Sequence, residues 1–269
     1  MLTVRMIARG VRRSMITRWA AHVGETVIFG TKAREFLAIG LLKGYYSSLW
    51  RRHWVWQARG EPHFTLHKLG LFQLMTGALS ESLSAYSRAF YSSGCVRAGD
   101  QVLDVGCGDG TFTCLSLAPR AAHVDAVDIE PSAIQYAKRH NVRTNVDYCR
   151  LNAVTDVLPR SDYDLVAFDG AIAHFSPEGS AELLRKIKSV MKPDGIFTGS
   201  ESVGLDADDH LQIFDSLEDM RKMLAPYWKH VRLMQSAYIL PVTGVTRIEG
   251  YWRASDSSER LDEISWYGG

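Results

Sequence analysis

Apolar positions follow two alternating patterns in the second half of the chain. From residue 100 onward, short apolar runs of strand length alternate with stretches whose apolar residues recur at helical spacing. The predicted strands cover residues 101–105, 123–128, 146–150, 164–168 and 195–199. The predicted helices between them cover residues 111–118, 131–140 and 178–191. Strands and helices that alternate in this way indicate βαβ units on a parallel sheet.

Both ends of the chain depart from this alternation. Near the C-terminus, residues 216–225 have helical spacing, and residues 230–240 and 246–254 are predicted strands joined by a Pro-Val-Thr-Gly connection. The Pro-Asp-Gly sequence at 193–195 is predicted to be a turn that leads into the fifth strand. Residues 80–92 have helical spacing and begin with Ser, which is a good helix cap.

The fold class predicted from these patterns is α/β. We expect a Rossmann-like, seven-stranded, mostly parallel sheet with an antiparallel C-terminal strand pair. A helical N-terminal region precedes this sheet. The predicted boundary separates a basic helical region, residues 1–94, from a sheet-forming domain, residues 95–269.

Charge is distributed unevenly, although the net charge is only +1. Residues 1–59 carry eleven Lys and Arg against two Asp and Glu, whereas the remaining residues carry twenty against twenty-eight. Such an asymmetry predicts an anionic partner for the first segment. We weigh three partners in this order: the acidic domain of the same chain or a second subunit, a membrane surface, and nucleic acid. Trp50, Trp54 and Trp56 beside Arg51 and Arg52 suit all three.

Several protein classes are disfavoured by composition. The four cysteines form no C-x-x-C pair, which argues against a zinc knuckle or a thioredoxin-type site. Free thiols fit a cytoplasmic protein, and no apolar run approaches the ~18 residues of a membrane-spanning helix. We therefore expect a cytoplasmic protein. Peripheral contact with the inner face of the membrane through residues 1–59 is the variant that the basic segment leaves open.

A glycine-rich loop directly follows the first predicted strand. The sequence Gly106-Cys107-Gly108-Asp109-Gly110 opens a helix, and glycines there permit a tight turn and close backbone approach to a ligand. A lone G-x-G is weak evidence for any nucleotide. Its spacing differs from the G-x-G-x-x-G of dinucleotide sites. Asp104 precedes the loop, and Asp128 ends the next strand about 20 residues on, where a ribose diol would bind.

These residues resemble a known family. DVGCGDG followed by AVDIE resembles motif I and the following acidic motif of class I S-adenosylmethionine-dependent methyltransferases, over about residues 100–255. The resemblance implies S-adenosylmethionine as the cofactor. It implies that the cofactor is surrounded by Asp104, Gly106, Cys107, Gly108, Gly110, Asp128, Ile129, Asn152, Ala153, Asp169 and Tyr86.

The resemblance also implies individual roles. The three glycines would line the methionine part, with Asp104 close to its amino group, while Asp128 would hold the ribose hydroxyls and Ile129 would pack on adenine. In the family an acid often follows the third strand and meets the adenine amino group. In this chain Asn152 and Ala153 occupy that place, which is a departure from the pattern. Tyr86 lies on the helix that often covers the cofactor.

The catalytic candidates are Asp169, His174, Glu201 and His210. Asp169 follows the fourth strand at the carboxyl edge of the sheet, where α/β folds bind ligands. His174 could remove a proton from a substrate hydroxyl, or it could only fix its loop by hydrogen bonding. Glu201 follows the fifth strand, and His210 follows three nearby acids. Consecutive loop residues rarely converge on one ion, so we expect no metal in this site.

The acceptor is the least constrained part of the prediction. We expect methylation of an oxygen of a small molecule, sugar or glycan, because the N-P-P-[YF] signature of base amino methylation is absent. One alternative is a methyltransferase acting on RNA or protein. Another is a non-catalytic protein that binds the cofactor and organises partners. A homodimer is compatible with each of these functions.

Overall fold

The computed structural model describes residues 83–204, 210–239 and 246–264. The chain divides into two compact units, residues 1–55 and residues 56–269, and every described residue belongs to the second unit. The predictions for the basic segment 1–59, for helices before residue 83 and for the acids at 206–209 lie outside the described residues. No described helix combines the length and apolar character that crossing a bilayer requires.

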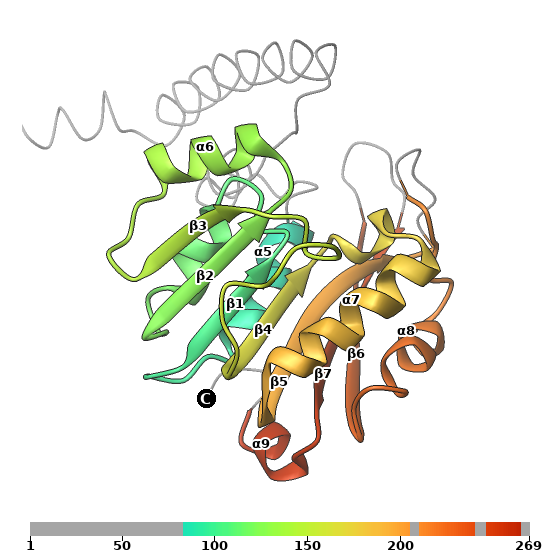
Figure 1. Cartoon of the computed structure of the whole chain (residues 1–269). Coiled ribbons are helices and arrows are strands. Elements are labelled where there is room, and N and C mark those ends of the chain that lie inside the picture. Colours follow the sequence, from blue (N-terminus) through green and yellow to red (C-terminus); the bar gives the residue numbers. More distant parts are fainter. Residues whose placement is uncertain (1–82, 205–209, 240–245, 265–269) are drawn as a thin grey trace, which may run out of the picture. The chain divides into compact units, whose positions relative to one another are not determined.

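A single seven-stranded sheet organises the described residues, in the order β3-β2-β1-β4-β5-β7-β6 (Figure 1). Neighbouring strands from β3 to β5 are parallel, and β7 is antiparallel to both β5 and β6. The strands are β1 (Gln101–Val105), β2 (His123–Asp128), β3 (Val146–Arg150), β4 (Tyr163–Asp169), β5 (Met191–Val203), β6 (His230–Ile239) and β7 (Thr246–Ser255). The predicted fold class is confirmed, including the antiparallel C-terminal pair.

Helices connect most of these strands, and local sequence explains where they begin. The helical elements are α5 (Leu83–Ser93), η1 (Thr113–Leu117), α6 (Pro131–His140), η2 (Ile172–His174), α7 (Pro177–Val190), α8 (Leu217–Leu224) and α9 (Ser258–Asp262). Pro131 and Pro177 occupy the first turns of α6 and α7. The Glu130 carboxylate and the Ser176 hydroxyl cap these helices by accepting backbone N–H groups.

The helix expected over 111–118 is present, but residues 113–117 of it, η1, are π-helical. One prediction needs correction and one helix was not predicted. The turn expected at 193–195 lies within β5, which begins at Met191 and bulges against β4 before Ile196. Gly195 fits that bulge, because a Cβ there would lie 3.0 Å from the Tyr163 carbonyl oxygen. The last helix, α9, was not predicted, because five residues carry little periodicity.

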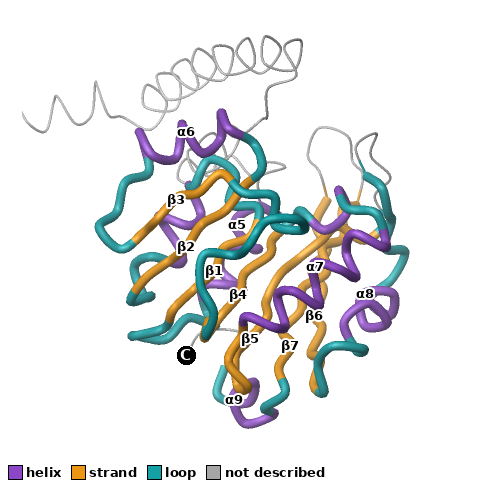
Figure 2. Tube along the Cα trace, in the orientation of Figure 1, coloured by secondary structure: helices purple, strands orange, loops and turns teal. Residues whose placement is uncertain are grey.

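The strands bury side chains on both faces of the sheet. Successive residues belong to opposite clusters: Leu103 and Val166 pack with α7 and α8, whereas Val102 and Leu165 pack with η1, α6 and α9. Figure 1 shows α7 over β4 and β5, and α5 against the opposite face. A loop and not a helix joins β3 to β4, as Figure 2 shows in teal. The carboxyl ends of β1, β2 and β3 are therefore bordered by loops.

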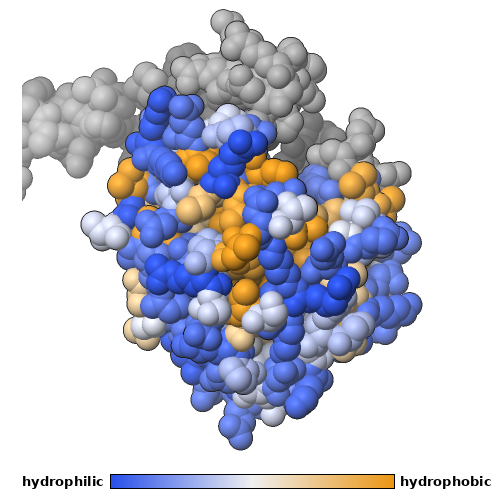
Figure 3. All heavy atoms as spheres, in the orientation of Figure 1, coloured by the Kyte–Doolittle hydropathy of each residue, from blue (hydrophilic) through white to orange (hydrophobic). Residues whose placement is uncertain are grey.

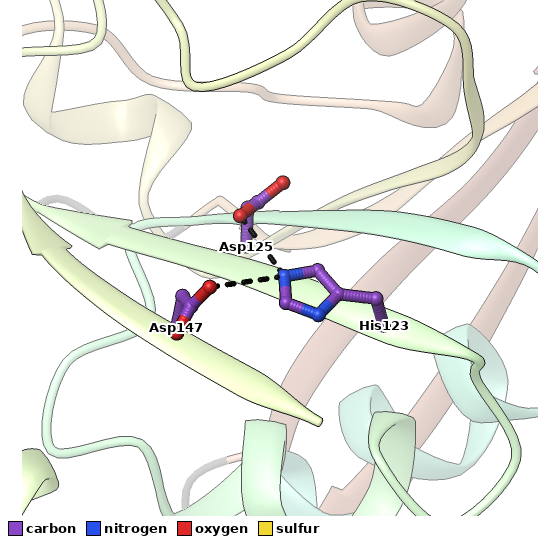
Figure 4. Close-up of side chains that lie close together, drawn as sticks. All are labelled: His123, Asp125 and Asp147. Atoms are coloured by element: carbon purple, nitrogen blue, oxygen red, sulfur yellow. Dashed lines mark hydrogen bonds and ion pairs between the residues drawn. The ribbon is translucent and has the colours of Figure 1, made fainter. Parts of the chain in front are cut away.

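A group of charged side chains lies toward the amino-terminal ends of β2 and β3. His123 Nε2 is 3.2 Å from Asp125 Oδ1 and 3.4 Å from Asp147 Oδ2 (Figure 4). Asp125 also accepts a hydrogen bond from the Tyr163 hydroxyl and forms an ion pair with Arg160. These contacts account for the burial of Asp125 without any ligand. The group lies away from the carboxyl ends of the strands, where the sequence places the cofactor.

Candidate cofactor and acceptor site

A cavity of about 570 Å³ opens at the carboxyl ends of β1, β2 and β3. Its lining is mostly apolar, and Figure 3 shows apolar surface between β3 and α7 on the face in view. Five predicted cofactor residues line the cavity: Gly106, Asp128, Ile129, Asn152 and Ala153. His174, Phe175 and Leu211 form part of its wall. An apolar cavity with few polar groups suits a nucleoside.

The glycine loop adopts a backbone that glycine permits. Gly106, Gly108 and Gly110 have φ angles of +72°, +54° and +72°. A Cβ on Gly108 would meet nothing within 4 Å, so this residue faces open space. A Cβ on Gly110 would lie 2.5 Å from the Tyr148 ring, so this glycine is also required by packing. Cys107 is buried beside them, and burial raises the pKa of its thiol.

Asp128 ties the end of β2 to the glycine loop. Its Oδ2 accepts a hydrogen bond from the Gly108 N–H at 2.8 Å, and its Oδ1 accepts one from the Glu130 N–H at 2.9 Å. Burial raises the pKa of Asp128, and these backbone donors oppose that rise. Each carboxylate oxygen retains a second lone pair. The side chain can therefore accept two further hydrogen bonds, as two ribose hydroxyls would supply.

Asp104 is a buried carboxylate with few hydrogen bonds to offset its loss of hydration. Within the described residues it accepts one hydrogen bond, from Thr113 Oγ1 at 2.6 Å. Burial raises its pKa to about 7, and the charges of Asp169 and Asp128 contribute. A cationic group placed beside Asp104 would stabilise its ionised form. The amino group of S-adenosylmethionine is such a cation, so Asp104 and the open space at Gly108 fit this cofactor.

The wall of the cavity beyond β4 is the short turn η2, which carries His174. The His174 and His210 rings lie edge to face with centroids 5.2 Å apart, so the structure brings two predicted catalytic residues together. The Leu211 N–H donates to the Ala173 carbonyl at 2.8 Å, and Gln212 Nε2 donates to the Ile172 carbonyl at 2.9 Å. The segment at 210–212 therefore holds η2 in place.

Glu201 also holds η2, from the side of β5. Its Oε2 accepts a hydrogen bond from the Ala173 N–H at 3.2 Å, one residue before His174. Its Oε1 accepts bonds from the Ser202 N–H and hydroxyl. The side chain is 3% exposed. Its described contacts are those of a residue that positions η2, and the assignment of Glu201 as catalytic stays a prediction.

Asp169, at the end of β4, is held by two hydroxyls. Ser92 of α5 donates to Oδ2 at 2.6 Å, and Ser200 of β5 donates to Oδ1 at 2.8 Å. Burial raises the pKa of Asp169 to about 6, against these hydrogen bonds and the charge of Arg88. Asp169 therefore lies at the predicted edge of the sheet but beneath α5, and it is not among the residues that line the cavity.

The helix α5 packs beside the carboxyl ends of β4 and β5 and the adjoining part of β7, which runs antiparallel to β5. Arg88 Nε donates to Glu249 Oε1 at 2.6 Å, and its Nη2 is 3.9 Å from Glu201. The Tyr91 ring packs on Tyr251 with centroids 4.1 Å apart. We call these contacts, with the bond between Ser92 and Asp169, the α5 clamp. Gly170 is required beneath it, because a Cβ there would overlap the Arg88 guanidinium.

Some of these residues were not found by sequence analysis. Thr113 and Glu249 lie in segments whose periodicity marks them only as helix and strand. Their roles depend on partners 9 and 161 residues away, Asp104 and Arg88. Arg88 lies on the helix that the resemblance predicts to cover the cofactor, but its pairing with Glu249 could not be predicted from that helix alone. The predicted contact of Tyr86 with the cofactor lies outside the described side chains.

The sheet order, the glycine loop and the cavity define a class I S-adenosylmethionine-dependent methyltransferase fold. Comparison with known proteins agrees. The profile of a methyltransferase domain family matches residues 102–195, which include the glycine loop. The chain therefore contains a methyltransferase domain of this class, whose cofactor is S-adenosylmethionine. This confirms the resemblance and the cofactor expected from the sequence.

Individual relatives match over part of their length. A ubiquinone biosynthesis O-methyltransferase from Xylella fastidiosa is 35% identical over 101 residues, which are 36% of this chain and 39% of that protein. A ribosomal protein L11 methyltransferase from Dictyoglomus thermophilum is 28% identical over 120 residues, which are 45% of this chain and 38% of that protein. The matches thus span about two fifths of these relatives.

A solved structure shows the same fold. The [4+2]-cyclase SpnF superposes with a TM-score of 0.50 and 15% sequence identity, covering 64% of this chain and 80% of that chain. At this identity the likeness concerns the fold alone, because one fold supports many reactions.

Proposed function

We propose that this chain transfers the methyl group of S-adenosylmethionine to an oxygen of a small-molecule acceptor. The observation that carries the proposal is the position of His174, beside His210 in the wall of the cofactor cavity. An alcohol or phenol begins protonated, so its methylation benefits from a base near the reacting oxygen. The 35% identity to a ubiquinone biosynthesis O-methyltransferase supports an oxygen acceptor.

Each group of residues has a distinct part in this proposal. The cofactor supplies an activated methyl on a sulfonium. Asp128 and Ile129 hold the nucleoside, and Asp104 binds the cationic amino group through its ionised carboxylate. His174 takes the acceptor proton, and the hydrogen bonds to Ile172 and Ala173 keep the imidazole in place. Because methyl transfer is an in-line displacement, such positioning contributes much of the rate.

The test is methyl transfer to matched pairs of small phenols and anilines. Tritium from labelled S-adenosylmethionine is expected on the phenols and not on the anilines. His174→Gln should lower kcat for phenols by about 10²-fold or more. Its affinity for S-adenosylhomocysteine should stay unchanged, which separates a catalytic role from a structural one. Equal methylation of anilines, or an unaltered kcat in His174→Gln, would contradict the proposal.

A protein acceptor is a second candidate, favoured by the likeness to a ribosomal protein L11 methyltransferase. It predicts that tritium enters the macromolecular fraction of a cell extract and that no small phenol or aniline is labelled. The same assay therefore distinguishes the two candidates.

A further inference from the structure

Three side chains toward the amino-terminal ends of β2 and β3 point toward one another (Figure 4). Asp125 and Asp147 are register partners on these parallel strands, and His123 precedes Asp125 by two residues on β2. Side chains two residues apart on a strand lie on the same face of the sheet, so the backbone places all three together. One donor atom from each side chain lies within 4.8 Å of the others, which is the convergence that a metal ion requires.

The distances match the coordination shell of a small divalent ion. Zn²⁺ binds imidazole nitrogen and carboxylate oxygen at about 2.1 Å, so two ligand atoms of a tetrahedral site lie about 3.4 Å apart. His123 Nε2 is 3.2 Å from Asp125 Oδ1 and 3.4 Å from Asp147 Oδ2. A ring nitrogen carries at most one proton, so Nε2 has a single N–H to share between two carboxylates. An ion bound to all three atoms satisfies each of them.

Neighbouring side chains orient Asp125, the most buried of the three ligands. Its side chain is 5% exposed, and its Oδ2 accepts a hydrogen bond from the Tyr163 hydroxyl at 2.9 Å. Arg160 Nε lies 2.9 Å from the same oxygen, so Oδ1 is the atom directed at His123. Hydrogen-bonded partners of this kind fix the orientation of a ligating carboxylate. The charge of Arg160 opposes a cation, so we expect micromolar affinity.

The site has access for an ion and room for a further ligand. Asp125, Asp147 and Arg160 are among the residues that line a cavity of about 540 Å³. The Asp147 side chain is 68% exposed, so it can rotate to complete the coordination shell, and water can supply the fourth ligand. An imidazole nitrogen among the ligands favours Zn²⁺ and similar ions over Mg²⁺, which prefers oxygen and retains its waters.

We propose that His123, Asp125 and Asp147 bind a divalent transition-metal ion, of which Zn²⁺ fits best, and that this ion links β3 to β2. Among the described strands, β3 lies at the edge of the sheet and pairs with β2 alone. An ion that binds both strands only in the folded state stabilises that edge. The cofactor cavity opens at the opposite ends of the same strands, so this site has a structural role that does not depend on methyl transfer.

The experiment titrates Zn²⁺ into the full, metal-free chain by calorimetry. The unaltered chain should bind Zn²⁺ with a dissociation constant of about 10 μM or tighter. His123→Gln, and Asp147→Asn at an exposed position, should each weaken this binding about tenfold or more, because each removes one ligand. His140→Gln is the matched control, since it removes an exposed imidazole at the end of α6 and should leave Zn²⁺ affinity unchanged.

Stability supplies a second readout. Zn²⁺ at about 100 times its dissociation constant should raise the Tm of the unaltered chain and of His140→Gln by about 5 °C or more. The Tm of His123→Gln and of Asp147→Asn should rise much less. Circular dichroism checks that each variant folds, and if His123→Gln does not fold, the exposed Asp147→Asn provides the comparison.

The contrary outcomes are equally specific. Absence of Zn²⁺ binding by the unaltered chain up to about 1 mM would overturn the proposal and leave His123 as a hydrogen-bonded partner of two carboxylates. Equal Zn²⁺ affinity in Asp147→Asn and His140→Gln would overturn it too, because the ion would then bind elsewhere. The affinity for S-adenosylhomocysteine should be the same with and without Zn²⁺, and a change would contradict the separation of the two sites.

Discussion

Two parts of the same sheet edge differ sharply. At the carboxyl ends of β1, β2 and β3, the chain leaves a cavity with an apolar lining and a few polar groups. At the carboxyl ends of β4 and β5 and the adjoining part of β7, the α5 clamp buries Arg88 against Glu249, and Ser92 against Asp169. The first part has unused hydrogen-bonding capacity at Asp128 and Asn152. In the second part, the charged groups already form ion pairs and hydrogen bonds with one another.

This difference predicts which residues affect ligand binding and which affect stability. Groups in the cavity can form further hydrogen bonds with a ligand, so their replacement should alter affinity. Groups in the α5 clamp already have partners within the chain, so their replacement should alter the free energy of unfolding. η2 lies between the two parts, since Glu201 of β5 holds it while His174 and Phe175 line the cavity.

The largest effect is expected from Glu249→Leu. Glu249 is fully buried and contacts both Arg88 and Arg247, so its loss leaves the buried Arg88 guanidinium with only the more distant Glu201 carboxylate beside it. We expect the free energy of unfolding, measured by urea titration, to fall by about 3–5 kcal/mol. The double variant Arg88→Met with Glu249→Leu should recover most of this loss. A single variant that loses less than about 1 kcal/mol would show that the pair behaves as a surface pair.

Asp128→Ala should have the next largest effect, on affinity. The carboxylate is expected to bind two ribose hydroxyls and also orders Gly108 of the glycine loop. Loss of these hydrogen bonds should weaken S-adenosylhomocysteine about 100-fold by calorimetry. Asp147→Ala, which removes an exposed carboxylate of β3, is the control and should bind normally. Equal affinity in the two variants would remove Asp128 from the cofactor site.

The pH dependence of cofactor binding should follow the ionisation of the Asp104 carboxylate. Its pKa is raised to about 7 by burial, and the cationic amino group of the cofactor needs the ionised form. Affinity should therefore rise about tenfold per pH unit below pH ~7 and level off above it. Without cofactor, the pH dependence of stability has the opposite sign, because the folded state holds the Asp104 proton more tightly than the unfolded state. The free energy of unfolding should fall as pH rises from about 4 to about 7.

Calorimetry between about pH 5.5 and about pH 8.5 measures the effect on binding. Asp104→Asn is the matched control, because it keeps the shape of the side chain and cannot ionise. It should bind more weakly and lose most of the pH dependence. A slope that persists unchanged in Asp104→Asn would assign the titration to another group.

The smallest effect is expected at Glu201. Glu201→Gln keeps an oxygen that can accept the Ala173 N–H, so the affinity for S-adenosylhomocysteine should change less than about twofold. Glu201→Leu removes the acceptor and should weaken binding about three- to tenfold by displacing η2. If Glu201→Gln were as damaging as Glu201→Leu, the charge beside Arg88 would matter more than the hydrogen bond.

Sequence patterns predicted the parts of the fold that depend on local chemistry. Short apolar runs located β1, β2 and β3, and glycines located the loop, because burial and positive φ angles leave signals within a few residues. The bulge in β5 was missed because it depends on Tyr163 of the neighbouring strand. The α5 clamp was missed because Arg88 and Glu249 are 161 residues apart. The spacing of apolar residues along the chain carries no signal for a contact between residues so far apart.

The most direct test of the account is a crystal structure of the full chain with S-adenosylhomocysteine bound. We predict that the ribose hydroxyls lie on Asp128, the purine lies against Ile129 and Asn152, and the amino group lies beside Asp104. We also predict that the ion pair between Arg88 and Glu249 persists. A nucleoside bound elsewhere on the chain, or one that enters by separating α5 from β7, would contradict the account.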